Sequence, residues 1–101
     1  MVQLVITSWW PITKADEVQK KFLEISQEKG QSPAIESSNM YISPCKTGWM
    51  SRSYNNINQG KLEEALTFLA TFMTGFNTIE GYGYKFSFAI TPEEAAAAQQ
   101  G

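Results

Sequence analysis

The fold is decided at the start of the chain, by the stretch VQLVITSWWP at residues 2–11. The stretch is rich in β-branched and aromatic residues, which favour strands, and the proline at its end cannot donate a hydrogen bond to a neighbouring strand. Successive side chains of a strand point to opposite faces, so Leu4 and Ile6 share one face while Val5 and Trp9 share the other. Neither face is strongly polar, which predicts a central strand that is covered on both sides.

The rest of the chain alternates between helical and strand patterns. Apolar residues on one helical stripe predict amphipathic helices over residues 14–29 and about 59–76, with Thr13 and Asn58 as their N-caps and Gly75 as the left-handed end of the second. Alternating side chains predict strands over residues 35–45, 49–56 and 81–90. Pro44 indicates that the first of these is an edge strand or ends early. Thr91 and Pro92 mark the start of a short C-terminal helix or tail.

The order strand, helix, strand, strand, helix, strand is the ferredoxin-like βαββαβ arrangement, an α+β fold. Right-handed crossovers place both helices on one face of a four-stranded antiparallel sheet. With 101 residues the chain can build one modest core. We therefore expect a ferredoxin-like domain over residues 1–90, followed by a C-terminal helix or frayed tail over residues 91–101.

The charge and the cysteine content of the chain limit which partners and which compartment are expected. The net charge is −2 and the eight basic residues are scattered, so we expect neither nucleic acid nor an acidic membrane surface as a partner. Cys45 is the single cysteine, which excludes an intrachain disulfide and suits a reducing compartment. No secretory leader and no apolar run of the ~20 residues that a membrane span needs are found. The sequence predicts a cytoplasmic protein.

Several chemistries lack the residues they need. The chain has no histidine, which removes the commonest general base and metal ligand. It also has no zinc-type cluster, serine triad or glycine-rich phosphate loop. We expect no metal and no cofactor, and the sequence assigns no catalytic residue.

The candidate ligand-binding residues are polar and aromatic side chains of the strands. Arg52 is the anchor of this set, because a guanidinium presents a fixed fork of donors to an anion or a carbonyl. The full set is Arg52, Tyr54, Asn39, Tyr41, Trp49 and Trp9. Tryptophan and tyrosine also serve packing and dimer interfaces, and a surface or ion-paired arginine is the alternative for Arg52. Trp9 and Trp10 point to opposite faces, so we expect one in the core and the other at the rim of a dimer.

In element order, size and aromatic-rich strands, residues 2–90 resemble the dimeric α/β-barrel superfamily. These small ferredoxin-like proteins include antibiotic-biosynthesis-type monooxygenases, stress-responsive barrel proteins and many uncharacterised members. The resemblance implies a homodimer, and pairing two sheets would cover the apolar face that the helices leave open. Iron–sulfur ferredoxins and metallochaperones need more cysteines than Cys45, and residues 49–56 do not match the basic motif of RNA-recognition domains.

Three functions are compatible with these patterns. The first is a homodimer that binds a small organic ligand in a cleft between sheet and helices. The second, implied by the resemblance alone, is a cofactor-independent monooxygenase-like enzyme. The third is a structural or oligomerisation module, in which the broad apolar face over residues 62–76 joins subunits. Whether the protein is an enzyme stays open at this point.

Overall fold

The computed structural model describes residues 2–100. Its elements, in chain order, are β1 (Gln3–Pro11), the 3-10 turn η1 (Ile12–Lys14), α1 (Ala15–Lys29), β2 (Ile35–Cys45), β3 (Gly48–Ile57), α2 (Leu62–Thr74), β4 (Gly83–Ala89) and α3 (Pro92–Gln100). Residue 101, the end of the predicted tail, lies outside the described residues. The division of the chain at residue 90 stays a prediction.

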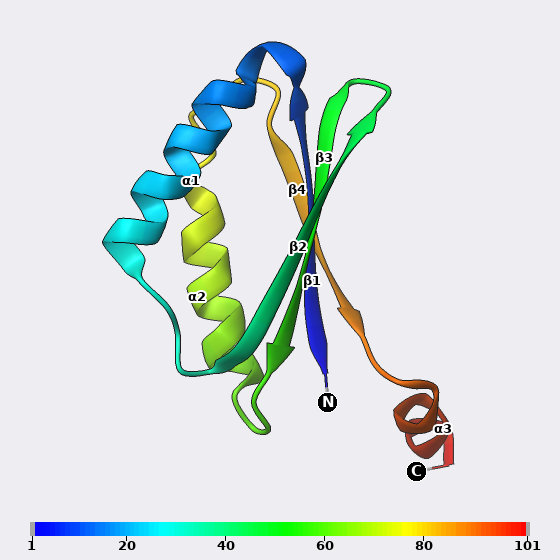
Figure 1. Ribbon diagram of the computed structural model, residues 1–101. Coiled ribbons are helices and arrows are strands. Elements are labelled where there is room, and N and C mark those ends of the chain that lie inside the picture. The colour runs from blue at the N-terminus through cyan, green and yellow to red at the C-terminus, as the bar shows by residue number, and fades with distance from the viewer. Residues whose placement is uncertain (1, 101) are drawn as a thin grey trace.

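The four strands form one antiparallel sheet in the order β2-β3-β1-β4. Both long helices cover the same face of this sheet, and α3 follows β4 beyond the end of the sheet (Figure 1). This arrangement confirms the predicted ferredoxin-like α+β fold. The expectation that Pro44 lies in an edge strand is also confirmed, because β2 pairs with β3 alone.

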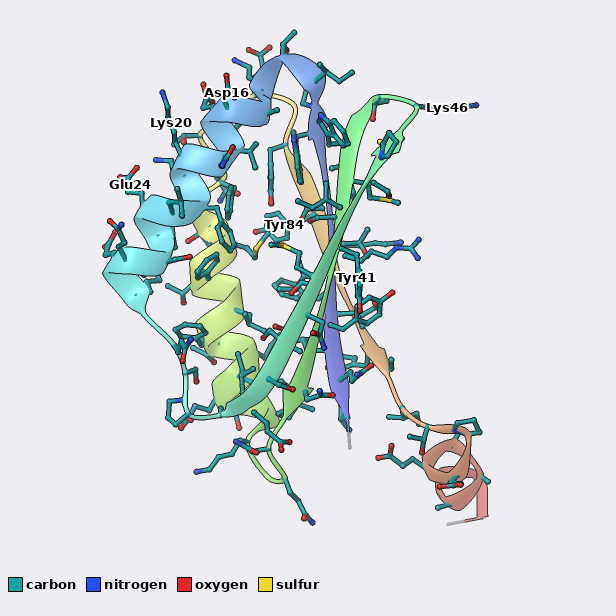
Figure 2. All side chains as sticks on the ribbon, viewed as in Figure 1. Asp16, Lys20, Glu24, Tyr41, Lys46 and Tyr84 are labelled. Atoms are coloured by element: carbon teal, nitrogen blue, oxygen red, sulfur yellow. The ribbon has the colours of Figure 1, made fainter. Side chains whose placement is uncertain are left out.

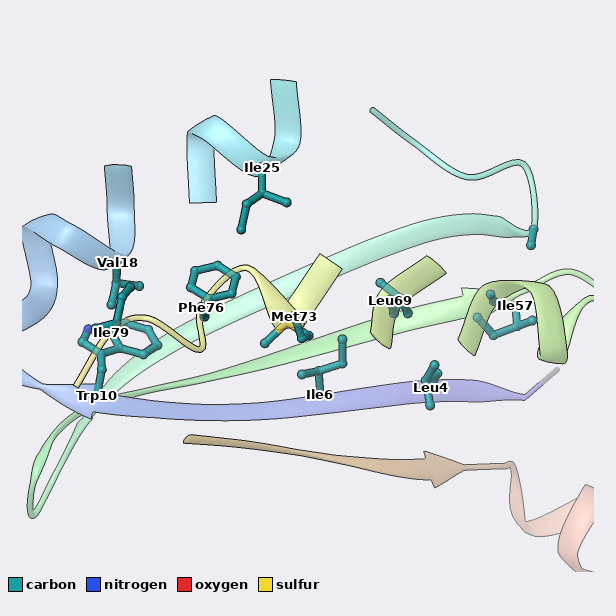
Figure 3. Packing of buried hydrophobic residues seen from close by; sticks show 12 residues of the cluster. Leu4, Ile6, Trp10, Val18, Ile25, Ile57, Leu69, Met73, Phe76 and Ile79 are labelled. Carbon is teal, nitrogen blue, oxygen red and sulfur yellow. The ribbon is translucent and has the colours of Figure 1, made fainter. Parts of the chain in front are cut away.

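The two faces of β1 separate as its alternation predicts. Leu4, Ile6 and Trp10 point to the helices and belong to the hydrophobic core. Figure 3 shows the core side chains meeting in the layer between sheet and helices. The buried members are Leu4, Ile6, Trp10, Val18, Ile25, Ala34, Ile57, Ala65, Leu69, Met73, Phe76 and Ile79. Val5, Thr7 and Trp9 lie on the opposite face of β1, which we call the open face because no helix of the described chain covers it.

A stack of rings closes the core beyond the end of α2. The rings of Phe76 and Tyr82 lie nearly parallel with their centroids 4.7 Å apart, and Tyr82 in turn stacks on Trp10 at 5.8 Å. Such offset stacks add about 0.5–1.5 kcal/mol per pair to the burial of the rings themselves. Phe76, the first core residue after α2, is thereby connected through Tyr82 to Trp10 near the end of β1.

The predicted helix caps of α1 and α2 are wrong. Residues 12–14 form a 3-10 turn, so Thr13 lies inside that turn and Lys14 takes the N-cap position without a side-chain hydrogen bond. At α2 the N-cap is Lys61, again without one. Asn58 instead donates its amide to the backbone oxygen of Pro33, at 2.8 Å, and so ties the start of this helix to the loop before β2.

The end of α2 also differs from expectation. Gly75 has φ −62°, a right-handed value, so α2 does not end in a left-handed glycine. The chain continues into further turns there, because the backbone N–H of Phe76 donates to Met73 and that of Ile79 donates to Phe76. At α3 the predicted start is present: Thr91 and Glu94 exchange side-chain-to-backbone hydrogen bonds of 3.0 and 3.1 Å, a complete capping box.

Within residues 2–100, no helix combines the length and the apolar character that a transmembrane span requires.

Candidate functional site

A cavity of about 900 Å³ lies between the helices and the sheet. Its volume falls in the range of ligand pockets, about 300–1,000 Å³. The cavity reaches the surface along β2, because the helix-facing Met40 and Ile42 of this edge strand line it and stay exposed. The helices therefore cover the centre of the sheet and leave its β2 edge open toward the cavity.

The walls of the cavity are apolar and aromatic. Phe22 of α1 meets Phe72 of α2 edge to face, with 5.8 Å between the ring centroids, and Phe68 and Phe76 flank Phe72. All four of these rings line the cavity. The width of the apolar stripe on α2 is thus explained by the cavity wall. Phe68 and Phe72 turn toward the cavity, and the expectation that this broad face joins subunits stays a prediction.

The floor of the cavity is polar. It is formed by β1 and β3, whose pairing places Ser8 opposite Ser51 and Asn55 opposite Leu4 on the helix-facing side. Ser51, Ser53 and Asn55 follow each other at every second position of β3, so one strand supplies three polar groups to one face. This row was missed in the sequence. The signal was the period of two in Ser51-Ser53-Asn55, which the larger side chains of Arg52 and Tyr54 between them obscured.

Asn55 is fixed in the floor of the cavity by hydrogen bonds to neighbouring strands. Its side chain is 2% exposed, and its Nδ2 donates to the backbone oxygen of Leu4 at 2.9 Å. Its Oδ1 accepts a hydrogen bond of 2.7 Å from the hydroxyl of Ser38 on β2. A buried amide is tolerated only when its donors and acceptors are bonded in this way. Asn55 therefore connects β3 to both β1 and β2 and is held in one orientation.

Ser51 differs from Asn55 because its hydroxyl has no hydrogen-bond partner among the described residues. The side chain is nevertheless almost fully buried and lines the cavity. A hydroxyl in this position can donate to or accept from a bound molecule at little cost, because no internal hydrogen bond has to be broken.

Tyr82 adds a phenol to the same site. Burial raises the pKa of Tyr82 above its ordinary value; interaction with the Ser8 hydroxyl opposes part of that rise, and the nearby Tyr84 adds to it. The phenol thus stays neutral at physiological pH. It offers a hydrogen-bond donor and an acceptor rather than a base. Within the described chain, two residues with an ionisable carboxyl or phenol line the cavity. They are Tyr82 and Glu36, which lies near the start of β2.

The predicted ligand-binding residues do not share one cleft between sheet and helices. Among the six, Trp49 alone lines the cavity. Arg52, Tyr54, Asn39 and Tyr41 line a shallow hollow of about 590 Å³ on the open face. The cause is the register between β1 and β3. Trp49 pairs with the core residue Trp10 and so faces the helices, and the residues of β3 at alternate positions, such as Arg52 and Tyr54, face the other side.

Figure 2 shows the two sides of the sheet through labelled side chains, with Tyr84 between sheet and helices and Tyr41 on the far side. Trp9 is the sixth candidate, and it also lies on the open face, at 37% exposure, while Trp10 is buried. The indole of Trp9 lies over Gly83, where an added Cβ would come within 2.6 Å of the ring. Gly83 of β4 therefore makes room for this tryptophan.

No metal centre is indicated by the acidic and thiol side chains. Across residues 2–100, no three of the Cys, Asp and Glu side chains gather closely enough to hold a metal ion.

Comparisons with known proteins agree on the fold. No protein-family model and no curated protein matches the chain. Among solved structures, a candidate antibiotic biosynthesis monooxygenase from Deinococcus radiodurans superimposes with a TM-score of 0.65 at 13% identity, over 90% of this chain and 92% of that one. A dimeric ferredoxin-like protein from an uncultured marine organism gives 0.61 at 9% identity, covering 90% and 94%.

A third structure is SnoaB, a cofactor-independent oxygenase from Streptomyces nogalater, with a TM-score of 0.58 at 7% identity over 90% of this chain and 93% of SnoaB. At such identities the likeness concerns the fold, because one fold carries many functions. In fold, the chain is thus similar to ferredoxin-like proteins of the antibiotic-biosynthesis-monooxygenase type and to a dimeric ferredoxin-like protein, as the sequence resemblance predicted.

Proposed function

We propose that the chain forms a homodimer in which each copy binds a small, largely apolar organic ligand in the cavity between sheet and helices. The observation that carries this proposal is the division of the cavity into an aromatic wall and a polar floor. Such a site favours a flat ring system with a hydroxyl or carbonyl at one edge. The ring would lie against Phe22, Phe68 and Phe72, and the polar edge would reach Ser51.

The experiment is a fluorescence titration with 2-naphthol, a flat bicyclic probe with one hydroxyl. We expect the wild-type chain to bind it, and Leu23→Trp to weaken binding about tenfold or more, because Leu23 lines the cavity and a larger side chain would fill it. Leu62→Trp is the matched control, since Leu62 is partly exposed on α2 and does not line the cavity. Ser51→Ala should weaken 2-naphthol by about three- to tenfold and leave naphthalene unchanged.

Equal binding by the two tryptophan variants would contradict the site. Equal effects of Ser51→Ala on both probes would contradict the role of the polar floor. If no probe binds and the chain still assembles, the structural or oligomerisation module becomes the better description.

The homodimer is proposed through the open face. In one copy this face leaves Trp9 and Tyr41 substantially exposed, and aromatic residues of this kind are enriched at interfaces. The similar ferredoxin-like protein from an uncultured marine organism is described as dimeric, which supports self-association of this chain. Pairing two open faces would bury these rings.

The dimer is tested by light scattering after size exclusion. We expect Trp9→Glu to raise the dissociation constant of the dimer about tenfold or more, because a charge would replace an aromatic anchor. Ile12→Glu is the control: Ile12 is exposed on the 3-10 turn that follows β1 and is not part of a strand. A dimer that survives Trp9→Glu unchanged would mean that the open face is not the interface.

A monooxygenase-like activity is the alternative function, suggested by what two of the similar structures are described as. It would require a group that removes a proton from the substrate. Of the two ionisable residues that line the cavity, Tyr82 has a raised pKa and is poorly suited to that task, and Glu36 is exposed on the edge strand β2. Binding is therefore the better-supported proposal, and oxygen uptake during the 2-naphthol titration would favour the enzyme instead.

A further inference from the structure

Arg52 stands in the middle of the open face without a partner. Its guanidinium makes no hydrogen bond, ion pair or ring contact with any other described residue. The five N–H donors of this group are therefore available to a ligand. A guanidinium binds a carboxylate best, because its fork of donors matches the two oxygens and forms two parallel charge-assisted hydrogen bonds.

The charge of the surrounding surface favours an anion. The register places Arg52 and Lys85 on either side of Thr7, so two cations flank β1 on the open face. By the same registers, no aspartate or glutamate of the four described strands takes a paired position on this face. The whole chain carries a net charge of −2, so this is a positive region on an acidic protein.

The shape and composition of the hollow favour an aromatic ring beside the anion. Tyr41 lies across from Arg52 on β2, and Tyr54 is two residues further along β3, so both tyrosines line the same hollow as Arg52. The two rings meet edge to face, with centroids 6.0 Å apart. They leave a hollow of about 590 Å³, which also has Asn39 in its lining. A single ring can pack against the tyrosine pair while its substituent points at Arg52.

We infer that the open face holds a second binding site, separate from the cavity, for a small aromatic carboxylate. The carboxylate is bound by Arg52 and the ring by Tyr41 and Tyr54. The site does not depend on the proposed function of the cavity, because the two lie on opposite faces of the sheet and share no lining residue. In a dimer paired through the open face, a ligand here would be enclosed between the copies.

The test compares benzoate with benzamide, which has nearly the same shape but no charge at neutral pH. Binding is measured by calorimetry and located by amide chemical shifts. We expect benzoate to bind at least about tenfold more tightly than benzamide, and Arg52→Gln to remove this difference. Arg52→Lys should restore only part of it, because lysine keeps the charge and loses the fork. The shifts should fall on β2 and β3.

Two control variants separate this site from its surroundings. Lys85→Gln removes the other cation of the face and should weaken benzoate by less than about threefold, since Lys85 does not line the hollow. Leu23→Trp fills the cavity and should leave benzoate binding unchanged. Equal affinity for the two probes, or full binding of benzoate by a folded Arg52→Gln chain, overturns the inference. Shifts confined to the cavity residues overturn it as well.

Discussion

Replacing Phe76 by alanine is expected to lower the free energy of unfolding by about 4 kcal/mol. The side chain is 2% exposed and stacks on Tyr82 at 4.7 Å, so its removal deletes a ring from the centre of the core and leaves a void. The loss is large for a domain whose total stability should be about 5–15 kcal/mol. Denaturant unfolding followed by far-UV circular dichroism measures it.

Phe88→Ala is the matched control for this prediction. Phe88 is the same residue type and lies on the helix-facing side of β4, where it pairs with the core residue Leu4, but it is 57% exposed. Because little of its surface is removed from water, we expect a loss below about 1 kcal/mol. Similar losses in the two variants would show that the core is not centred where the structure places it.

Gly48→Ala is expected to cost about 3 kcal/mol or more, for a backbone reason. Gly48 has φ +148°, a value that residues with a side chain rarely adopt. It also pairs with Pro11 at the end of β1, where an added Cβ would lie 2.7 Å from the backbone nitrogen of Ile12 and 2.9 Å from the carbonyl carbon of Pro11. Backbone atoms cannot move aside as a flexible side chain can, so the hairpin between β2 and β3 must shift.

The control is Gly60→Ala, in the loop before α2. Gly60 also has a positive φ, +78°, but an added Cβ would meet nothing within 4 Å. Only the conformational cost remains, about 1–2 kcal/mol. Thermal unfolding of the two variants under the same conditions gives the comparison. If Gly60→Ala is the more damaging change, the close approach of β1 to the hairpin is not the limiting factor.

Some features were predictable because they depend on local periodicity. The alternation in residues 2–11 assigned Leu4 and Ile6 to one face and Trp9 to the other, and the structure confirms it. The order and type of the long elements follow from the same kind of pattern, and they were enough for the ferredoxin-like fold. These predictions hold in the folded protein because the face on which a side chain lies is set by its position within its own helix or strand.

Features that depend on a single turn were less predictable. Thr13 and Asn58 are residue types that often cap helices. Thr13 instead lies inside a 3-10 turn, and the side chain of Asn58 donates a hydrogen bond to the backbone oxygen of Pro33. Polar side chains of this kind can bond to several nearby backbone groups. Which bond forms is therefore decided by the path of the chain before the helix, and a local motif does not contain that path.

The sequence by itself determined the elements, their order and the two faces of β1. It could not determine which face of β3 meets the helices, because Trp49, Ser51 and Asn55 on one side alternate with Arg52 and Tyr54 on the other, and both sets mix polar with aromatic groups. The tertiary structure decided this by pairing Trp49 with the buried Trp10. Since a strand alternates strictly, that one pairing sent Asn55 to the cavity and Arg52 to the open face.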